Sequence, residues 1–81
     1  MKENEIVDCI LSYLKKQGKI VEKDTNLFST NTIDSMGVIE LVIFIEEEIG
    51  VKLGQDVMRA DNFQTVKKIA EIVKEIEGAN E

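Results

Sequence analysis

Ser35 is the residue whose type and setting most directly suggest chemistry, because it lies in the segment IDSMG directly before a long apolar run. A serine hydroxyl acts as a nucleophile when a base within hydrogen-bond reach takes its proton, and a third group usually holds that base. The chain has no histidine, and the lysines nearest in sequence, Lys23 and Lys52, form no Ser-x-x-Lys arrangement. The neighbouring Asp34 is too weak a base. A small serine hydrolase is therefore the least favoured class of function.

Metal and disulfide chemistry have few candidate residues in this chain. Cys9 is the one cysteine, which excludes an internal disulfide and provides no pair of thiolate ligands. Because histidine is also absent, a structural zinc site is not expected. Cys9 falls among the apolar positions of the first predicted helix, and we interpret it as a small hydrophobic residue in or near the core.

Two uses of Ser35 remain once self-sufficient catalysis is set aside. Serine and aspartate both accept hydrogen bonds from the first N–H groups of a helix, and the dipeptide Asp34-Ser35 alone favours this capping role. Alternatively, another enzyme modifies the serine. A helix N-terminus accommodates a linked phosphate, and the small Gly37 in the first turn leaves room for a second protein.

The charge of the chain is concentrated around this serine. The net charge is −6, and the stretch 24–51 contains no lysine or arginine but holds six acids, whereas the remaining acids and bases balance. Such a surface is a poor partner for nucleic acid, whose phosphates need Lys and Arg contacts. Basic protein surfaces are the expected partners, because the negative electrostatic potential of this stretch attracts them toward it.

Apolar spacing predicts three helices in a single domain covering residues 1–81. Helices are expected at about 3–17, 35–49 and 65–78, with Gly50 ending the second and Thr65 capping the third. One short helical turn is expected within 55–63, and no segment alternates as a strand does. The sequence therefore predicts an all-α bundle of three main helices and one short helix.

The connection between the first two helices is long for a compact domain and is expected to be ordered. Its apolar residues are predicted to pin it to the core; they are Ile20, Val21, Leu27, Phe28 and Ile33.

The second predicted helix has two apolar faces. One is wide enough to face a core and consists of Val38, Leu41, Val42, Ile45 and Ile49. The other consists of Met36, Ile39 and Ile43, and it is flanked by Glu40, Glu46 and Glu47. Because a buried side should not be lined by glutamates, this second face is expected to be at least partly exposed. It either covers the long connection or the short segment 55–63, or it docks protein partners, with the acids selecting basic ones.

The run IDSMGVIELVIFIEEEIGV resembles the signature of acyl carrier proteins and of the related peptidyl and D-alanyl carriers. The resemblance extends over nearly the whole chain, through the Leu27-Phe28 pair of the long connection to the last helix after Phe63. It implies a four-helix acyl-carrier-type bundle that is not itself an enzyme. No apolar run approaches the roughly 20 residues that a membrane helix needs, and the start MKENEIVDCILSYLKK lacks the basic head and cleavage site of a signal peptide. We therefore expect a cytoplasmic, monomeric protein without membrane or nucleic-acid partners.

The resemblance also implies the functional site. Ser35 would receive 4′-phosphopantetheine from coenzyme A, transferred by a phosphopantetheinyl transferase that brings Mg²⁺ and its own base. The arm would carry an acyl group as a thioester for the ligase, synthase and transferase enzymes of fatty-acid, polyketide or related biosynthesis. Residues matching the partner-recognition positions are Asp34, Met36, Ile39, Glu40 and Ile43, and Glu46 and Glu47 complete the expected docking face.

Some residues of this chain differ from those of the carriers of fatty-acid synthesis, so a cargo other than a fatty acyl group is also considered. Gly37 stands where those carriers often have a second acid, and Phe44 replaces a small residue and is expected to narrow any internal pocket. The start DSMG and Phe63 are more similar to D-alanyl carriers and to discrete carriers of secondary pathways. An aminoacyl carrier loaded by an adenylating ligase is therefore an alternative. An unmodified helical interaction module is an alternative of another class.

Overall fold

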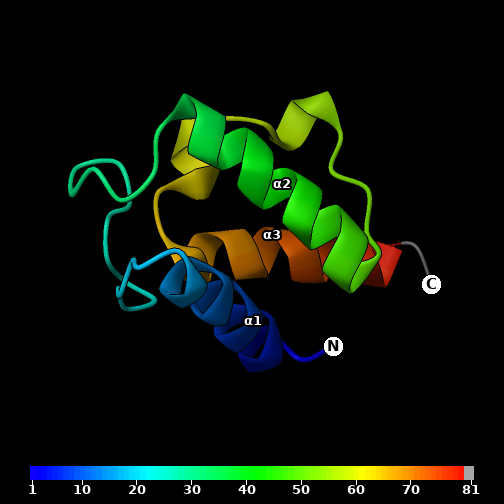
Figure 1. The fold of residues 1–81 in the computed structure, drawn as a ribbon. Coiled ribbons are helices and arrows are strands. Elements are labelled where there is room, and N and C mark those ends of the chain that lie inside the picture. The colour runs from blue at the N-terminus through cyan, green and yellow to red at the C-terminus, as the bar shows by residue number, and fades with distance from the viewer. Residues whose placement is uncertain (80–81) are drawn as a thin grey trace.

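The computed structural model describes residues 1–79, which form helices and connecting segments without any strand (Figure 1). The three helices are α1 (Glu3–Lys16), α2 (Ser35–Ile49) and α3 (Val66–Ala79). Two 3₁₀ turns lie between α2 and α3, and these are η1 (Gln55–Val57) and η2 (Ala60–Phe63). The predicted all-α bundle is confirmed. The short fourth segment differs from the prediction, because it consists of two 3₁₀ turns rather than one helical turn.

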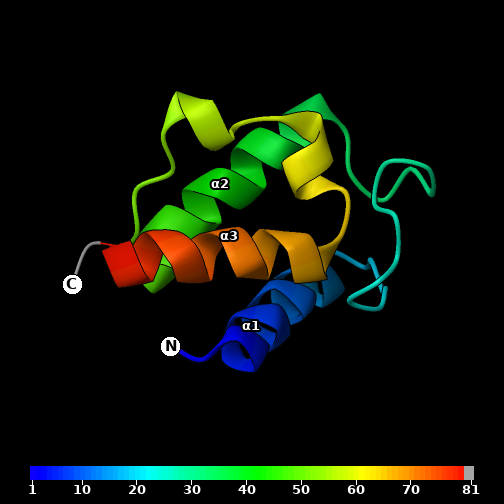
Figure 2. The same ribbon diagram turned by 180° about the vertical axis from the view of Figure 1, so that it is seen from behind.

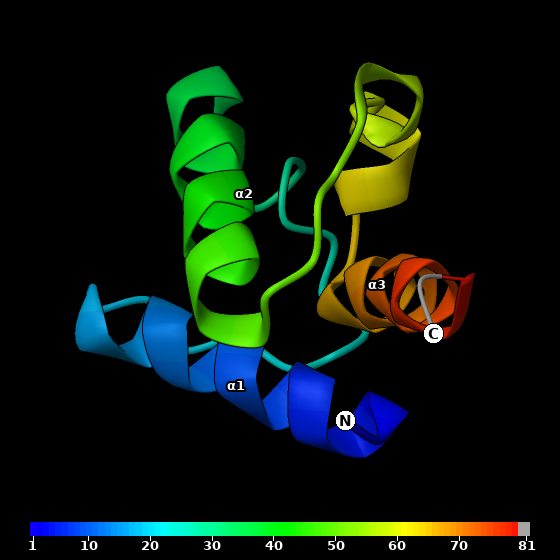
Figure 3. The ribbon, with the colours of Figure 1, turned by 90° about the vertical axis from the view of Figure 1, so that its right-hand side faces the viewer.

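The N-terminal end of α2 lies at the end of the molecule away from α1. Figure 3 shows α2 upright, with its first residues at the top and α1 crossing beneath its last residues. The 3₁₀ turns lie above α3 at the same end as the start of α2. Seen from behind, in Figure 2, η2 again lies at the end of the bundle where α2 begins. The fold therefore brings the segment 55–63 close to Ser35.

The core is built by one stripe from each helix. In α2 the predicted core face is confirmed, since Leu41, Val42 and Ile45 are buried and Val38 and Ile49 pack against the buried cluster. The residues that meet them from the other two helices are Ile6, Ile10 and Leu14 of α1 and Val66, Ile69 and Val73 of α3. Burying these apolar side chains contributes roughly 25 cal/mol to folding for each Å² of apolar surface removed from water. Because only one stripe of α2 is buried, the helix is held to the bundle by that side.

The predicted helix ends are present. Gly50 follows α2 with a φ of 83°, the left-handed conformation that glycine adopts without a steric penalty, and its N–H bonds to the carbonyl of Glu46. At the start of α3 the Thr65 hydroxyl accepts a hydrogen bond of 3.1 Å from the N–H of Lys68.

The long connection between α1 and α2 is anchored to the start of α3. The N–H of Leu27 donates to the carbonyl of Gln64 at 2.7 Å, and the N–H of Lys67 donates to the carbonyl of Lys23 at 3.0 Å. Leu27 and Ile33 are buried, as predicted. The same prediction was wrong for Ile20, which is 82% exposed. The anchored connection fixes the point at which α2 begins.

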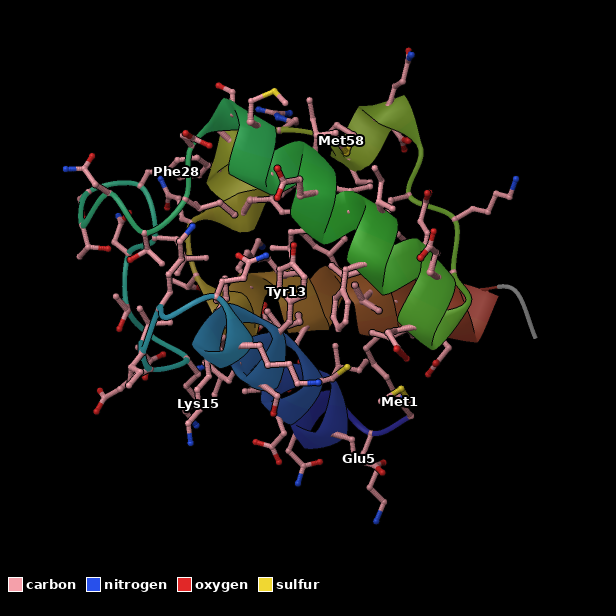
Figure 4. The ribbon with its side chains drawn as sticks, in the orientation of Figure 1. Met1, Glu5, Tyr13, Lys15, Phe28 and Met58 are labelled. Atoms are coloured by element: carbon pink, nitrogen blue, oxygen red, sulfur yellow. The ribbon has the colours of Figure 1, made fainter. Side chains whose placement is uncertain are left out.

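Tyr13 of α1 and Phe44 of α2 stack between the two helices, with ring centroids 4.3 Å apart. Figure 4 labels Tyr13 between α1 and α2. Phe44 therefore packs toward α1. The small gap in the core is lined by other residues, namely Leu53, Asn62, Phe63, Ile69, Ile72 and Val73, and it would not admit a water molecule. No helix among the described residues combines the length and apolar character that crossing a membrane requires.

Candidate functional site

Asp34 caps α2. Its carboxylate oxygen Oδ1 accepts a hydrogen bond of 2.8 Å from the N–H of Gly37, and its carbonyl accepts one of 2.9 Å from the N–H of Val38. The backbone of Asp34 is extended, with φ −122°, as expected of a residue that precedes the first helical turn. Asp34, and not Ser35, is therefore the N-cap residue of α2.

Ser35 is the first residue of α2, and its side chain is exposed. Within residues 1–79, no group forms a hydrogen bond with its hydroxyl. The capping explanation of Ser35 is therefore not needed for this helix. The hydroxyl stands at the tip of the molecule, where an enzyme can reach it.

Gly37 is needed because the chain is crowded on its inner side. A Cβ atom at this position would lie 2.7 Å from Cγ1 of Ile33 and 3.3 Å from Oδ1 of Asp34. Ile33 is buried and belongs to the core cluster, so it has little freedom to move aside. The glycine lets the residue before the cap pack under the first turn of α2, and it thereby places Asp34 and Ser35.

Gly37→Ala is expected to destabilise the protein despite the higher helix propensity of alanine. Propensity alone predicts a gain of about 1 kcal/mol. The contact with Ile33 is an overpacking change, which costs about 1–3 kcal/mol, so we expect a net loss of up to about 2 kcal/mol. Urea unfolding of both proteins measures the difference. A variant that is more stable than the wild type would show that the Ile33 side chain moves aside at little cost in free energy.

The second apolar face of α2 is exposed. Met36, Ile39 and Ile43 are 63%, 48% and 50% exposed. Glu40 and Glu47 on the same helix are also exposed. The predicted exposure is confirmed, and the long connection does not bury these side chains. They form an apolar strip with an acidic border, running from the turn that holds Ser35.

Glu46 has a different environment from the other glutamates of the expected docking face. Its side chain is partly buried, and its Oε2 accepts a hydrogen bond of 3.0 Å from the N–H of Leu53. This bond ties the segment after α2 back onto the helix. Glu46 therefore has a structural role in the fold.

A surface hollow of about 260 Å³ lies beside Ser35. Its lining residues are Phe28, Ser35, Val38, Ile39, Met58, Arg59 and Ala60. No local sequence pattern predicts this grouping, because Met58 and Arg59 lie more than twenty positions after Ser35. The one available signal was composition, since Arg59 is the only arginine of the chain.

The Cys9 thiol is not poised for reaction. Burial raises its pKa, and the nearby charge of Glu48 raises it further, while Lys16 opposes both effects. A thiol with a raised pKa is almost entirely protonated at neutral pH, and the thiolate is the reactive form. Cys9 is therefore a weak nucleophile at neutral pH.

The residues around Ser35 fit the phosphate-linked arm that the resemblance implies. The hydroxyl is exposed and free of hydrogen bonds, the cap is made by Asp34, and the adjoining hollow gives the first part of an arm an apolar wall and one cation. Among residues 1–79, no group of three or more metal-binding side chains comes together.

Comparisons with known proteins agree with the family that the sequence resembles. The family model described as "Phosphopantetheine attachment site" matches residues 4–75. The D-alanyl carrier protein of Streptococcus uberis is 35% identical over 57 residues, covering 70% of this chain and 72% of that protein. The D-alanyl carrier protein of Streptococcus pyogenes serotype M1 is 32% identical over 56 residues, covering 69% of this chain and 71% of that protein. The probable acyl carrier protein PigG of a Serratia species is 27% identical over 77 residues, covering 94% of this chain and 88% of that protein.

These similarities identify the function of the chain as that of a carrier, and its prosthetic group as covalently attached 4′-phosphopantetheine. The chain belongs to the family of phosphopantetheine-binding carrier proteins.

Proposed function

We propose that Ser35 bears the arm and that this chain acts as a discrete carrier rather than as an enzyme. When attached, the arm supplies a thiol on which acyl or aminoacyl groups are held as thioesters. The observation that carries the proposal is the exposed Ser35 hydroxyl, which is free because Asp34 makes the cap. Cys9 is a weak competitor as a nucleophile, because burial raises the pKa of its thiol and lowers the thiolate fraction at neutral pH.

Attachment requires a base that this chain does not supply. The Ser35 oxygen forms a bond to the phosphorus of coenzyme A that bears pantetheine, and the bond from that phosphorus to the adenosine bisphosphate portion breaks. A phosphopantetheinyl transferase accepts the serine proton and brings Mg²⁺. The chain contributes the position of the hydroxyl, which the Asp34 cap and the buried Ile33 fix. Preorganisation of this kind lowers the barrier without any catalytic group on the carrier.

Partner enzymes are proposed to dock on the exposed strip of α2. Met36, Ile39 and Ile43 would provide apolar contact, and Asp34, Glu40 and Glu47 would attract basic surfaces. We place Glu46 at the border of this docking face, because its carboxylate is engaged with Leu53. The partners are the transferase and the ligase, synthase and transferase enzymes that load or use the cargo. We propose that the carrier meets them in the cytoplasm as a monomer.

Intact mass and peptide mapping test the attachment site. Coexpression with a broad-specificity phosphopantetheinyl transferase should add one phosphopantetheine, and the tryptic peptide 24–52 that contains Ser35 should carry the whole increase. An increase that maps to another residue would refute Ser35 as the site. An unmodified chain that still binds partner enzymes would favour the plain helical interaction module. Ester hydrolysis by the purified protein would favour the hydrolase.

The closed core favours a small cargo. The gap between η2 and α3 would not admit a water molecule, so an acyl chain finds no prepared cavity there. We propose a short acyl or aminoacyl group that stays outside the bundle. The D-alanyl carriers among the relatives support the aminoacyl alternative, and PigG supports the acyl one. Assaying an adenylating ligase encoded beside the protein with D-alanine and with short carboxylic acids would distinguish the two.

Thermal unfolding of two loaded forms tests the closed core. Octanoyl has six more methylenes than acetyl, and each one buried is worth about 0.8 kcal/mol. Burying even half of them would raise the Tm by roughly 10 °C or more in a domain of this size. We expect the acetyl and octanoyl forms to unfold at the same temperature within about 2 °C. A large rise for octanoyl would show that the core opens and would favour long-chain cargo.

A further inference from the structure

The hollow beside Ser35 is built by three separate segments of the chain. The long connection contributes Phe28, α2 contributes Ser35 and Val38, and the segment between η1 and η2 contributes Met58. Figure 4 shows Phe28 and Met58 on the two sides of the first half of α2. Because Ser35 itself is part of the lining, a group attached to its oxygen begins beside this hollow.

Arg59 is the one base that lines the hollow. Its Nε lies 3.4 Å from Oδ1 of Asp61, and both side chains are largely exposed. An exposed pair of this kind is weak. Within residues 1–79 the terminal nitrogens of the guanidinium have no partner, so they can bind a phosphate oxygen. Nearby acids, by contrast, repel a phosphate, and Asp61 is one of them.

We infer that Arg59, Met58, Phe28 and Val38 hold the pantetheine arm against the protein. The inference rests on the proposed attachment at Ser35. Arg59 would bind the phosphodiester, and the apolar side chains would pack against the dimethyl-bearing carbon that follows it. The tether makes the contact intramolecular, so weak individual interactions suffice.

The same arrangement links arm release to partner docking. Ile39 lines the hollow and also belongs to the exposed strip of α2. A partner enzyme that covers Ile39 would compete with the arm for this side chain. Arg59 and its neighbours would therefore keep the arm on the carrier between encounters and yield it when a partner docks.

Methyl-labelled methionine provides the test, because the chain has three methionines in different positions. Met58 lines the hollow, Met36 is adjacent to Ser35 but outside the lining, and Met1 is remote in sequence. Converting the apo protein to the phosphopantetheine form should shift the Met58 methyl resonance and give nuclear Overhauser effects from the arm methyls to Met58. The Met36 resonance should shift less, although its residue is the next in the chain.

Charge variants identify the role of Arg59. Arg59→Gln should lower the ratio of held to free arm about two- to fivefold, the strength of an exposed ion pair, and shrink the Met58 shift. Asp61→Asn should enlarge the shift. Lys52→Gln is the matched control, because it removes one positive charge beyond the far end of α2, about 20 Å from Ser35.

Mass spectrometry separates the two proposals. A chain that accepts no arm on Ser35 refutes both. A chain that is modified on Ser35 but keeps its Met58 resonance unshifted refutes this inference alone. A Met58 shift that is equal in Arg59→Gln and wild type refutes the role of Arg59.

Discussion

Replacing Ser35 with alanine is expected to abolish attachment of the arm and to leave the fold unchanged. The reason is that Asp34 alone caps α2. Its Oδ1 accepts a hydrogen bond of 2.8 Å from the N–H of Gly37, and the Ser35 hydroxyl forms no hydrogen bond within residues 1–79. Removing an exposed oxygen without a partner changes the free energy of unfolding by at most about 0.5 kcal/mol. Intact mass after coexpression with the transferase measures attachment, and urea unfolding measures stability.

Two variants of Asp34 serve as controls for Ser35→Ala. Asp34→Ala removes the cap and should cost about 1 kcal/mol, which lowers the Tm by roughly 4–8 °C in a domain of this size. Asp34→Asn keeps a capping oxygen but removes the charge, so it should unfold like the wild type and be modified more slowly. If Ser35→Ala lost as much stability as Asp34→Ala, the serine would be a structural residue. If Ser35→Ala still gained the arm, the attachment site would lie elsewhere.

Helix positions could be predicted from the sequence because the apolar spacing and the end signals agree. The interval 35–49 has a continuous core stripe and ends at Gly50, and α2 occupies that interval. The long connection was harder, since its apolar residues have no regular spacing. Ile20 was predicted to be pinned to the core and is exposed. The hydrogen bonds that anchor the connection use backbone groups of Leu27 and Gln64, which side-chain patterns do not reveal.

The site was predictable in part for the same reason. Exposure of Ile39 and Ile43 followed from the glutamates beside them, which cannot line a core. The choice between Asp34 and Ser35 as the cap could not be made, because both side chains can accept the bond. Arg59 could not be placed near Ser35, because the grouping depends on how the segment after α2 returns across the bundle. The bond from Leu53 to Glu46 depends on that same return.

Truncating the exposed apolar strip should produce the second large effect. Ile39→Ser combined with Ile43→Ser removes two anchors that partner enzymes are proposed to cover, and such truncations cost about 1–2 kcal/mol of binding each. Together they amount to about 2–4 kcal/mol, so we expect kcat/KM of the transferase for this carrier to fall roughly 30- to 700-fold, since each 1.4 kcal/mol is a factor of ten. Because both side chains are about half buried, we expect the double variant to lose roughly 1.5–3 kcal/mol of stability and to remain folded.

Ile20→Ser is the matched control for the strip, because Ile20 is the most exposed isoleucine of the described residues and lies on the long connection. It should leave kcat/KM unchanged. Charge is tested in the same assay by Glu40→Lys with Glu47→Lys, against Glu75→Lys on α3 as the control. The double change should lower kcat/KM, and added salt should narrow the difference from wild type, because exposed charges are screened beyond about 10 Å at 0.1 M. Equal losses for Ile20→Ser and for the strip variant would mean that partners do not dock on this face of α2, even if Ser35 carries the arm.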